Sequence, residues 1–224
     1  LSVAAYVAHR AKRAATMPLT THLAKIWKSS GVDSLSRFRF KTGDVVLFTC
    51  NTSLRYLMNS PFSHVGLVVD AGRSMFHTSP GTQVPRTEPV RRAIARVLSE
   101  KRMFRHCEVA VRRMTMPEEV EKRAELLMSE YVSQQHNHVH MYNAAGLAGQ
   151  LFKQVFLMSK HGGTSNDVRY CSGLVARALQ RGGILKRWWC KVILPCHFGD
   201  PGLECELEFA KGCAMWPPVQ LVMS

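Results

Sequence analysis

Two short apolar runs constrain the fold of this chain most strongly. Residues 44–48 (Asp-Val-Val-Leu-Phe) follow the turn-forming residues 41–43, and residues 65–69 (Val-Gly-Leu-Val-Val) end at the turn residues 70–72. Runs of this length, bounded by turn formers, are typical of buried strands. Residues 75–76 (Met-Phe) follow closely enough to predict a third strand that forms a hairpin with the second.

The middle of the chain predicts one more strand and then a helix. Residues 108–113 alternate enough for a strand. Thr115 then precedes Pro117 and Glu118 with the spacing of a capping box, and apolar residues follow at helical intervals. We therefore expect a helix to begin at this point.

Two further helices are predicted in the second half. Residues 144–160 form an amphipathic segment, residues 162–167 are typical of a loop, and residues 172–180 carry an apolar side that ends at Gly182 and Gly183. The tail beyond is rich in Pro, Trp and Cys and is expected to wrap the domain. Together these elements predict an α+β fold with a small antiparallel sheet packed against helices.

The first 32 residues differ from the rest and are expected to form a basic N-terminal extension. One domain is expected over residues 33–224, and a turn-like stretch at 31–36 marks the change between the two. No acidic residue precedes Asp33. The extension is typical of a mitochondrial targeting segment, and equally of a basic helix that docks on a partner. A mitochondrial location is therefore expected, with the cytoplasm as the alternative. The basic residues of the extension are Arg10, Lys12, Arg13, Lys25 and Lys28.

The chain is strongly basic. Its 30 Lys and Arg exceed its 16 Asp and Glu, for a formal net charge of +14 and a pI near 9.9. This excess favours an anionic partner, either RNA in a ribonucleoprotein or an anionic lipid surface. No run of about 18 apolar residues is present, so no transmembrane segment is expected.

The seven cysteines are odd in number and irregularly spaced, which predicts free thiols in a reducing compartment. Two clusters contain metal-binding residue types. The cluster in the tail has no CxxC pair, and the histidine cluster at 136–140 has no neighbouring carboxylate or Cys. We therefore predict no metal site and no cofactor. The residues concerned are Cys190, Cys196, His197, Cys205 and Cys213, and His136, His138 and His140.

Cys171 and His64 are the candidate catalytic residues. Cys171 lies directly before the helix predicted at 172–180, and a helix N-terminus favours a thiolate. His64 begins the strand at 65–69, where a base would be held firmly. The alternatives are a buried structural thiol and a structural histidine.

These residues belong to segments that resemble a known family. Residues 42–48 (TGDVVLF), 62–69 (FSHVGLVV) and 170–175 (YCSGLV) resemble motifs of the circularly permuted papain-like hydrolases of the NlpC type, which include YiiX-like and lecithin:retinol acyltransferase-like branches. Residues 142–143 (Tyr-Asn) resemble a further element of the group. The resemblance covers roughly residues 40–185 and implies a papain-like fold.

The resemblance also implies roles for individual residues. Cys171 would be the nucleophile and His64 the base. Bacterial members carry an acidic residue on the next strand, where this chain has His77. The lecithin:retinol acyltransferase branch uses a second histidine at a comparable interval, so His77 is the expected third catalytic residue. Gly173 stands where bacterial members often carry an acidic residue. This difference affects the expected rim of the substrate site more than the nucleophile.

The sequence thus favours an enzyme, a cysteine-dependent hydrolase or acyltransferase that acts on an amide, ester or thioester carbonyl. Peptide-amide and lipid-acyl substrates are both compatible with the resemblance. Backbone N–H groups at the start of the helix, including that of Cys171, are the expected oxyanion donors. The alternatives are a catalytically silent structural subunit of a basic organellar assembly, such as a mitochondrial ribonucleoprotein, and a lipid-binding module that uses the same cleft.

Overall fold

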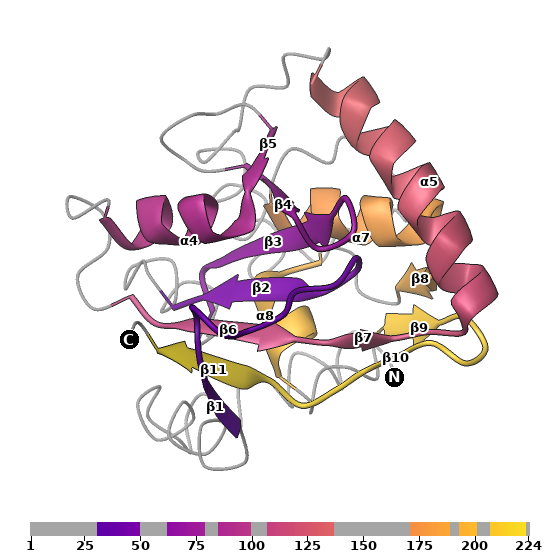
Figure 1. Cartoon of the computed structure of the whole chain (residues 1–224). Coiled ribbons are helices and arrows are strands. Elements are labelled where there is room, and N and C mark those ends of the chain that lie inside the picture. The colour runs from indigo at the N-terminus through magenta and orange to yellow at the C-terminus, as the bar shows by residue number, and fades with distance from the viewer. Residues whose placement is uncertain are drawn as a thin grey trace, which may run out of the picture.

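A computed structural model describes residues 31–49, 62–78, 85–99, 107–136, 171–188, 193–200 and 207–222. They form a mixed α+β structure in which a seven-stranded sheet packs against helices (Figure 1). The sheet consists of β1 (Gly31–Ser34), β2 (Val45–Phe48), β3 (His64–Val69), β4 (Ser74–His77), β5 (Arg86–Pro89), β6 (Val109–Arg112) and β11 (Val219–Val222). The helices are α4 (Val90–Ser99), α5 (Glu118–His136), α7 (Cys171–Arg181) and α8 (Pro195–Gly199). Two small sheets pair β7 (Met114–Thr115) with β10 (Ala214–Met215), and β8 (Leu185–Trp188) with β9 (Leu207–Phe209).

The strand order of the main sheet is β1-β11-β6-β2-β3-β4-β5. Neighbouring strands are antiparallel except β1 and β11, which are parallel. The C-terminal strand β11 therefore lies inside the sheet, so the tail completes the sheet as well as covering it. The interpretation of 31–36 as turn-like is wrong for its first four residues, because Gly31–Ser34 form strand β1 through pairing with β11.

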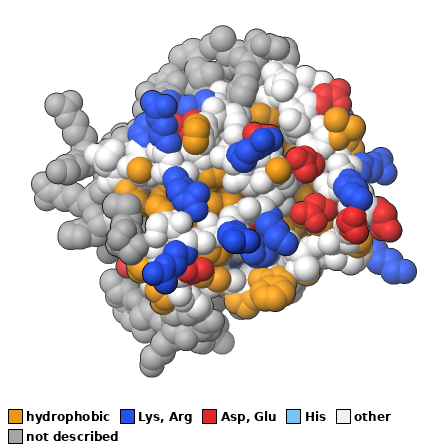
Figure 2. Space-filling model, in the orientation of Figure 1, with side chains coloured by type: hydrophobic (Ala, Val, Ile, Leu, Met, Phe, Trp, Pro, Cys, Tyr) orange, Lys and Arg blue, Asp and Glu red, His pale blue; other side chains and the backbone are white. Residues whose placement is uncertain are grey.

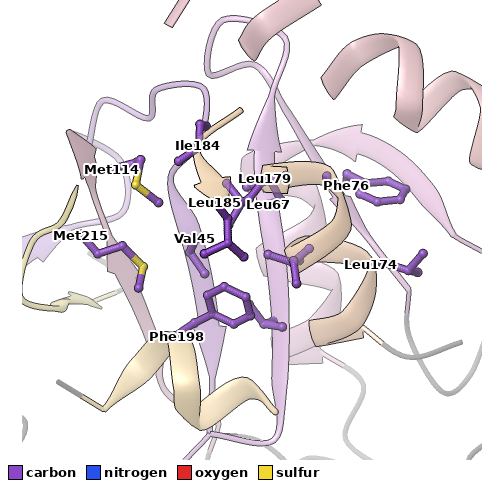
Figure 3. Close-up of a cluster of buried hydrophobic side chains, with 14 of the residues drawn as sticks. Val45, Leu67, Phe76, Met114, Leu174, Leu179, Ile184, Leu185, Phe198 and Met215 are labelled. Carbon is purple, nitrogen blue, oxygen red and sulfur yellow. The ribbon is translucent and has the colours of Figure 1, made fainter. Parts of the chain in front are cut away.

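Strand β2 is buried along its whole length because both faces of the sheet are covered. Val45 and Leu47 pack in a cluster with α5 and α7 (Figure 3). Val46 and Phe48 pack in a second cluster with α4 on the opposite face. A strand covered on both faces has no polar side, which explains why its sequence is a continuous apolar run.

Helix α7 is the element that carries the candidate nucleophile. It spans Cys171–Arg181, one residue longer at each end than the predicted helix. Its buried side includes Leu174 and Leu179, which pack against the sheet (Figure 3). Gly183, just beyond the helix, has φ +73°, a left-handed conformation that favours glycine.

Arg112, at the end of β6, ties the tail to the sheet. Its guanidinium is buried and donates hydrogen bonds to the backbone carbonyls of Trp216 (2.6 Å), Phe198 (3.2 Å) and Met215 (3.3 Å). A buried guanidinium needs such acceptors because the loss of water around a charge is costly. Arg112 thus links β6 to helix α8, to the last residue of β10 and to the residue after it.

Several predictions lie wholly or largely outside the described residues: the extension before residue 31, the helix at 144–160, the loop at 162–167 and the element at 142–143. The side chain of His136, together with His138, His140, Cys190 and Cys205, also lies outside them. Within the described ranges, no helix is long and apolar enough to cross a membrane.

The cysteines do not all match the prediction of free thiols. Cys196 and Cys213 are buried thiols that form no disulfide, as predicted for the tail. Cys107 is disulfide-bonded, so the prediction is wrong at that position. Cys107 lies two residues before the start of β6.

Candidate active site

Cys171 is the first residue of α7, and its side chain is buried against the start of β3. The backbone N–H groups of Val65, Ser172 and Cys171 itself hydrogen-bond to the thiol and lower its pKa, but burial outweighs them and raises that pKa to about 11. The start of the helix is fixed by Ser172, whose hydroxyl donates to the carbonyl of Ile193 at 2.8 Å. The thiol therefore lies at the first peptide of β3, next to His64.

His64 begins β3 and is held by its neighbours in the sheet. It pairs in register with Phe48, and the two rings lie 5.3 Å apart between centroids. Burial lowers the pKa of His64 to about 3, with a smaller contribution from the charge of His77. Its Nε2 atom is buried and has no hydrogen-bond partner among the described residues.

His77 ends β4 beside His64. The strands are antiparallel, so the start of β3 and the end of β4 lie at the same end of the hairpin. The two imidazole rings lie 5.7 Å apart between centroids, at an interplanar angle of 70°. Burial lowers the pKa of His77 to about 3, followed by the charges of Arg96 and Arg86. Its Nδ1 atom is buried without a partner in the described part of the chain.

The other ring nitrogen of His77 is bound. Nε2 lies 2.8 Å from Oε1 of Glu88 on β5, and Glu88 also forms an ion pair with Arg96 on α4. The Glu88 side chain is only 12% exposed, so this contact is sheltered from water. Neither Glu88 nor Arg96 was predicted from the sequence.

The candidate residues reach the site from two layers of the fold. Alternation along the strands puts His64 and His77 on the face of the sheet that α4 covers, together with Val68 and Met75. Cys171 comes from α7 on the opposite face and reaches the sheet at the end of β3. The structure contains no hydrogen bond between the described side chains of Cys171 and His64; the thiol instead contacts the N–H of Val65, the residue after His64. Catalytic hydrogen bonds often tighten only when substrate binds.

The resting site is therefore electrically neutral. With the pKa of the thiol near 11 and that of His64 near 3, both groups are uncharged at neutral pH. The sequence predicted that the helix N-terminus would favour a thiolate. The backbone N–H groups act in that direction, but the loss of water around the thiol has the larger effect.

Metal-binding residue types do not converge in the described ranges. No group of three or more His, Cys, Asp or Glu side chains there is placed to hold a metal ion. His197, from the tail cluster, has a different role: the backbone N–H of Leu194 donates to its Nδ1 at 2.8 Å at the start of α8.

No family model and no curated protein matches this chain. A solved structure, that of the metalloprotein YiiX from Escherichia coli O157:H7, is similar with a TM-score of 0.42 and 15% identity. The match covers 80% of this chain and 97% of that protein. The backbone fold of this chain is thus weakly similar to that of YiiX.

Proposed function

We propose that this chain is a cysteine-dependent hydrolase or acyltransferase, built on a permuted papain-like domain of the NlpC type. One observation carries the proposal. The thiol that opens α7 receives the N–H of Val65, and the neighbouring residue is a buried histidine whose Nε2 has no partner among the described residues. A nucleophile at a helix N-terminus beside a rigidly held base is the arrangement that thiol catalysis requires.

The reaction begins with attack of the Cys171 sulfur on the carbonyl carbon of an amide, ester or thioester. His64 takes the thiol proton as the C–S bond forms, and the carbonyl π electrons move onto oxygen. Collapse of this tetrahedral intermediate expels the amine, alcohol or thiol, which receives the proton from His64 and leaves an acyl-thioester on Cys171. Water then releases the acid in a hydrolase, whereas an amine or hydroxyl acceptor takes the acyl group in a transferase.

The backbone at the start of α7 supplies the donors for the oxyanion. The N–H groups of Cys171 and Ser172 hydrogen-bond to the thiol in the resting state. They become available to a carbonyl oxygen when the sulfur moves toward substrate. The hydrogen bond from Ser172 to Ile193 holds this first turn in place while the charge develops.

Peptide amides and lipid acyl groups are the proposed substrate classes, and a polyanion is the proposed partner. The net charge of +14 supports an RNA or an anionic lipid surface as the neighbour. On the face shown in Figure 2, Lys and Arg side chains are dispersed among acidic and apolar ones. The acid-free stretch before Asp33 supports a role in mitochondrial targeting or in docking, as an extension of a domain over 33–224.

A second function is favoured by one specific observation, the neutral state of the site. A thiol with its pKa raised to about 11 and a histidine with its pKa lowered to about 3 are also what two buried structural residues show. The chain would then be a silent subunit of a basic ribonucleoprotein. The intact thiol and imidazole favour the enzyme, because a structural subunit needs neither group at this end of β3.

Turnover measurements separate the two functions. We expect wild-type protein to release product from at least one of a panel of acyl esters, phospholipids and peptide amides, and we expect Cys171→Ser to abolish that activity. Cys213→Ser, which changes another buried free thiol, is the matched control and should retain it. No turnover, together with RNA affinity that falls steeply with salt, would favour the structural subunit.

A further inference from the structure

Glu88, the hydrogen-bond partner of His77, supplies the negative charge that a histidine lacks when it serves as the third catalytic residue. A neutral imidazole supports a positive charge on the base less well than a carboxylate does. In this structure a carboxylate lies directly behind His77, since Glu88 Oε1 is 2.8 Å from His77 Nε2. Strand pairing sets the position: Met75 of β4 is registered with Glu88 of β5, on the face of the sheet that also carries His77.

The contact between His77 and Glu88 fixes the position of a proton. Glu88 is ion-paired with Arg96, and a carboxylate only accepts hydrogen bonds. The Nε2 atom of His77 must therefore carry the proton and donate it to Glu88. Arg96 Nη2 also lies 3.4 Å from that nitrogen, but this longer contact joins two donors and is not a hydrogen bond in that state.

The consequence for His64 follows from the two ring nitrogens that remain. His77 Nδ1 is left with a bare lone pair, and it is buried without a partner in the described residues. His64 Nε2 is likewise buried without a partner in the described residues, on a ring whose centroid lies 5.7 Å from that of His77. With a proton on His64 Nε2, one of these two atoms would be a donor and the other an acceptor.

We propose that Glu88 is a positioning residue: it accepts the Nε2 proton of His77, which makes His77 Nδ1 the acceptor for the Nε2–H of His64. This inference rests on the proposed function, because it leaves Nδ1 of His64 as the base for the Cys171 thiol. When His64 takes the thiol proton it becomes an imidazolium, and the hydrogen bond to His77 stabilises it. The chain Cys171–His64–His77–Glu88 then carries a carboxylate at its far end.

The charges around His77 show why Glu88 matters. Burial is the main cause that lowers the pKa of His77, and the charges of Arg96 from α4 and Arg86 from β5 lower it further, while His64 faces it from β3. Glu88 is the acidic side chain in contact with His77 among the described residues. Without it, two guanidinium groups would oppose the positive charge that forms on His64, and the tautomer of His77 would be free to change.

The test reads the tautomer directly and then the rate. Protein with ¹⁵N-labelled histidine is examined by two-bond ¹H–¹⁵N correlation at neutral pH, as wild type, Glu88→Gln and Glu208→Gln. Glu208 is a matched control because it is an ion-paired glutamate on the small β8–β9 sheet. We expect His77 to be the Nε2–H tautomer in wild type and in the control, and a mixture of tautomers in Glu88→Gln.

In the same samples, kcat for an acyl donor should fall about tenfold to a hundredfold in Glu88→Gln, as is typical when an outer-shell partner is lost, with KM unchanged. An Nδ1–H tautomer in the wild type overturns the inference even if the variants fail to fold. A Glu88→Gln protein with the wild-type tautomer and kcat also overturns it. A wild type that turns over no acyl donor overturns the proposed function instead, while its tautomer still decides the hydrogen bond to Glu88.

Discussion

The thiol of Cys171 is expected to alkylate slowly at neutral pH and faster with each step toward alkaline pH. Only the thiolate reacts, and the pKa of this thiol is about 11. At pH 7 the thiolate fraction is then about 10⁻⁴, whereas a cysteine with an ordinary pKa of about 8.5 has about 3%. The ratio predicts a reaction about 300-fold slower than that of an ordinary thiol, with about a tenfold rise per pH unit.

The assay is a time course of iodoacetamide labelling between pH 6 and pH 10, read by mass spectrometry of the peptide that contains Cys171. The same cysteine in urea-unfolded protein is the reference. The slope with pH is decisive, because limited access to a buried thiol slows the reaction at every pH alike. His64, with its pKa near 3, stays neutral over this range, so His64→Ala should leave the slope unchanged.

A plateau in the pH profile would contradict a neutral thiol in the resting protein. If the folded protein reaches a constant rate below pH 8, and His64→Ala removes it, then Cys171 and His64 form a thiolate–imidazolium pair at rest. That result would mean that the N–H groups and the histidine outweigh burial, the reverse of the balance found in the structure.

Two further predictions concern the framework around the site, and each is measured by urea unfolding. Arg112→Met leaves three backbone carbonyls without their charged donor and should lower the free energy of unfolding by ~3–5 kcal/mol, whereas Arg73→Met, at an exposed ion pair, should cost at most about 1 kcal/mol. Equal losses in the two variants would contradict the role of Arg112. Gly199→Ala places a Cβ 2.2 Å from the ring of Phe62 and should cost ~1–3 kcal/mol. Gly31→Ala meets no atom closer than 3.9 Å and should stay within about 0.5 kcal/mol; an unchanged Gly199→Ala protein would show that α8 moves freely away from the sheet.

The local elements that build the site could be predicted from the sequence because their signals are short-range. The apolar runs gave β2 and β3, and the apolar spacing after Cys171 gave α7, all confirmed within one or two residues. Helix α4 was missed although Val90, Ala93, Ile94 and Val97 have helical spacing. Arginines fill the positions between them and obscure the apolar side.

The missed parts of the site depend on pairing between distant segments. Glu88 stands alone in its segment and has no local signal; the registers of β3–β4 and β4–β5 bring it next to His77. The pairing of β1 with β11 joins the two ends of the described chain, and no local pattern encodes it. The neutral state of Cys171 also followed only from its burial, which outweighed the helix N-terminus that the sequence showed.

A Cys171–His64 site is tested most directly by the mass of the protein after brief exposure, at neutral pH, to an acyl ester that the protein turns over. A bound substrate lets His64 take the thiol proton during attack, whereas alkylation by iodoacetamide depends on the resting thiolate. We expect one acyl group per chain, located by peptide mapping on Cys171 and released by hydroxylamine as a thioester is, and strongly reduced acylation in His64→Ala. Acylation spread over several residues, or equal acylation of Cys171 with and without His64, would contradict a Cys171–His64 site.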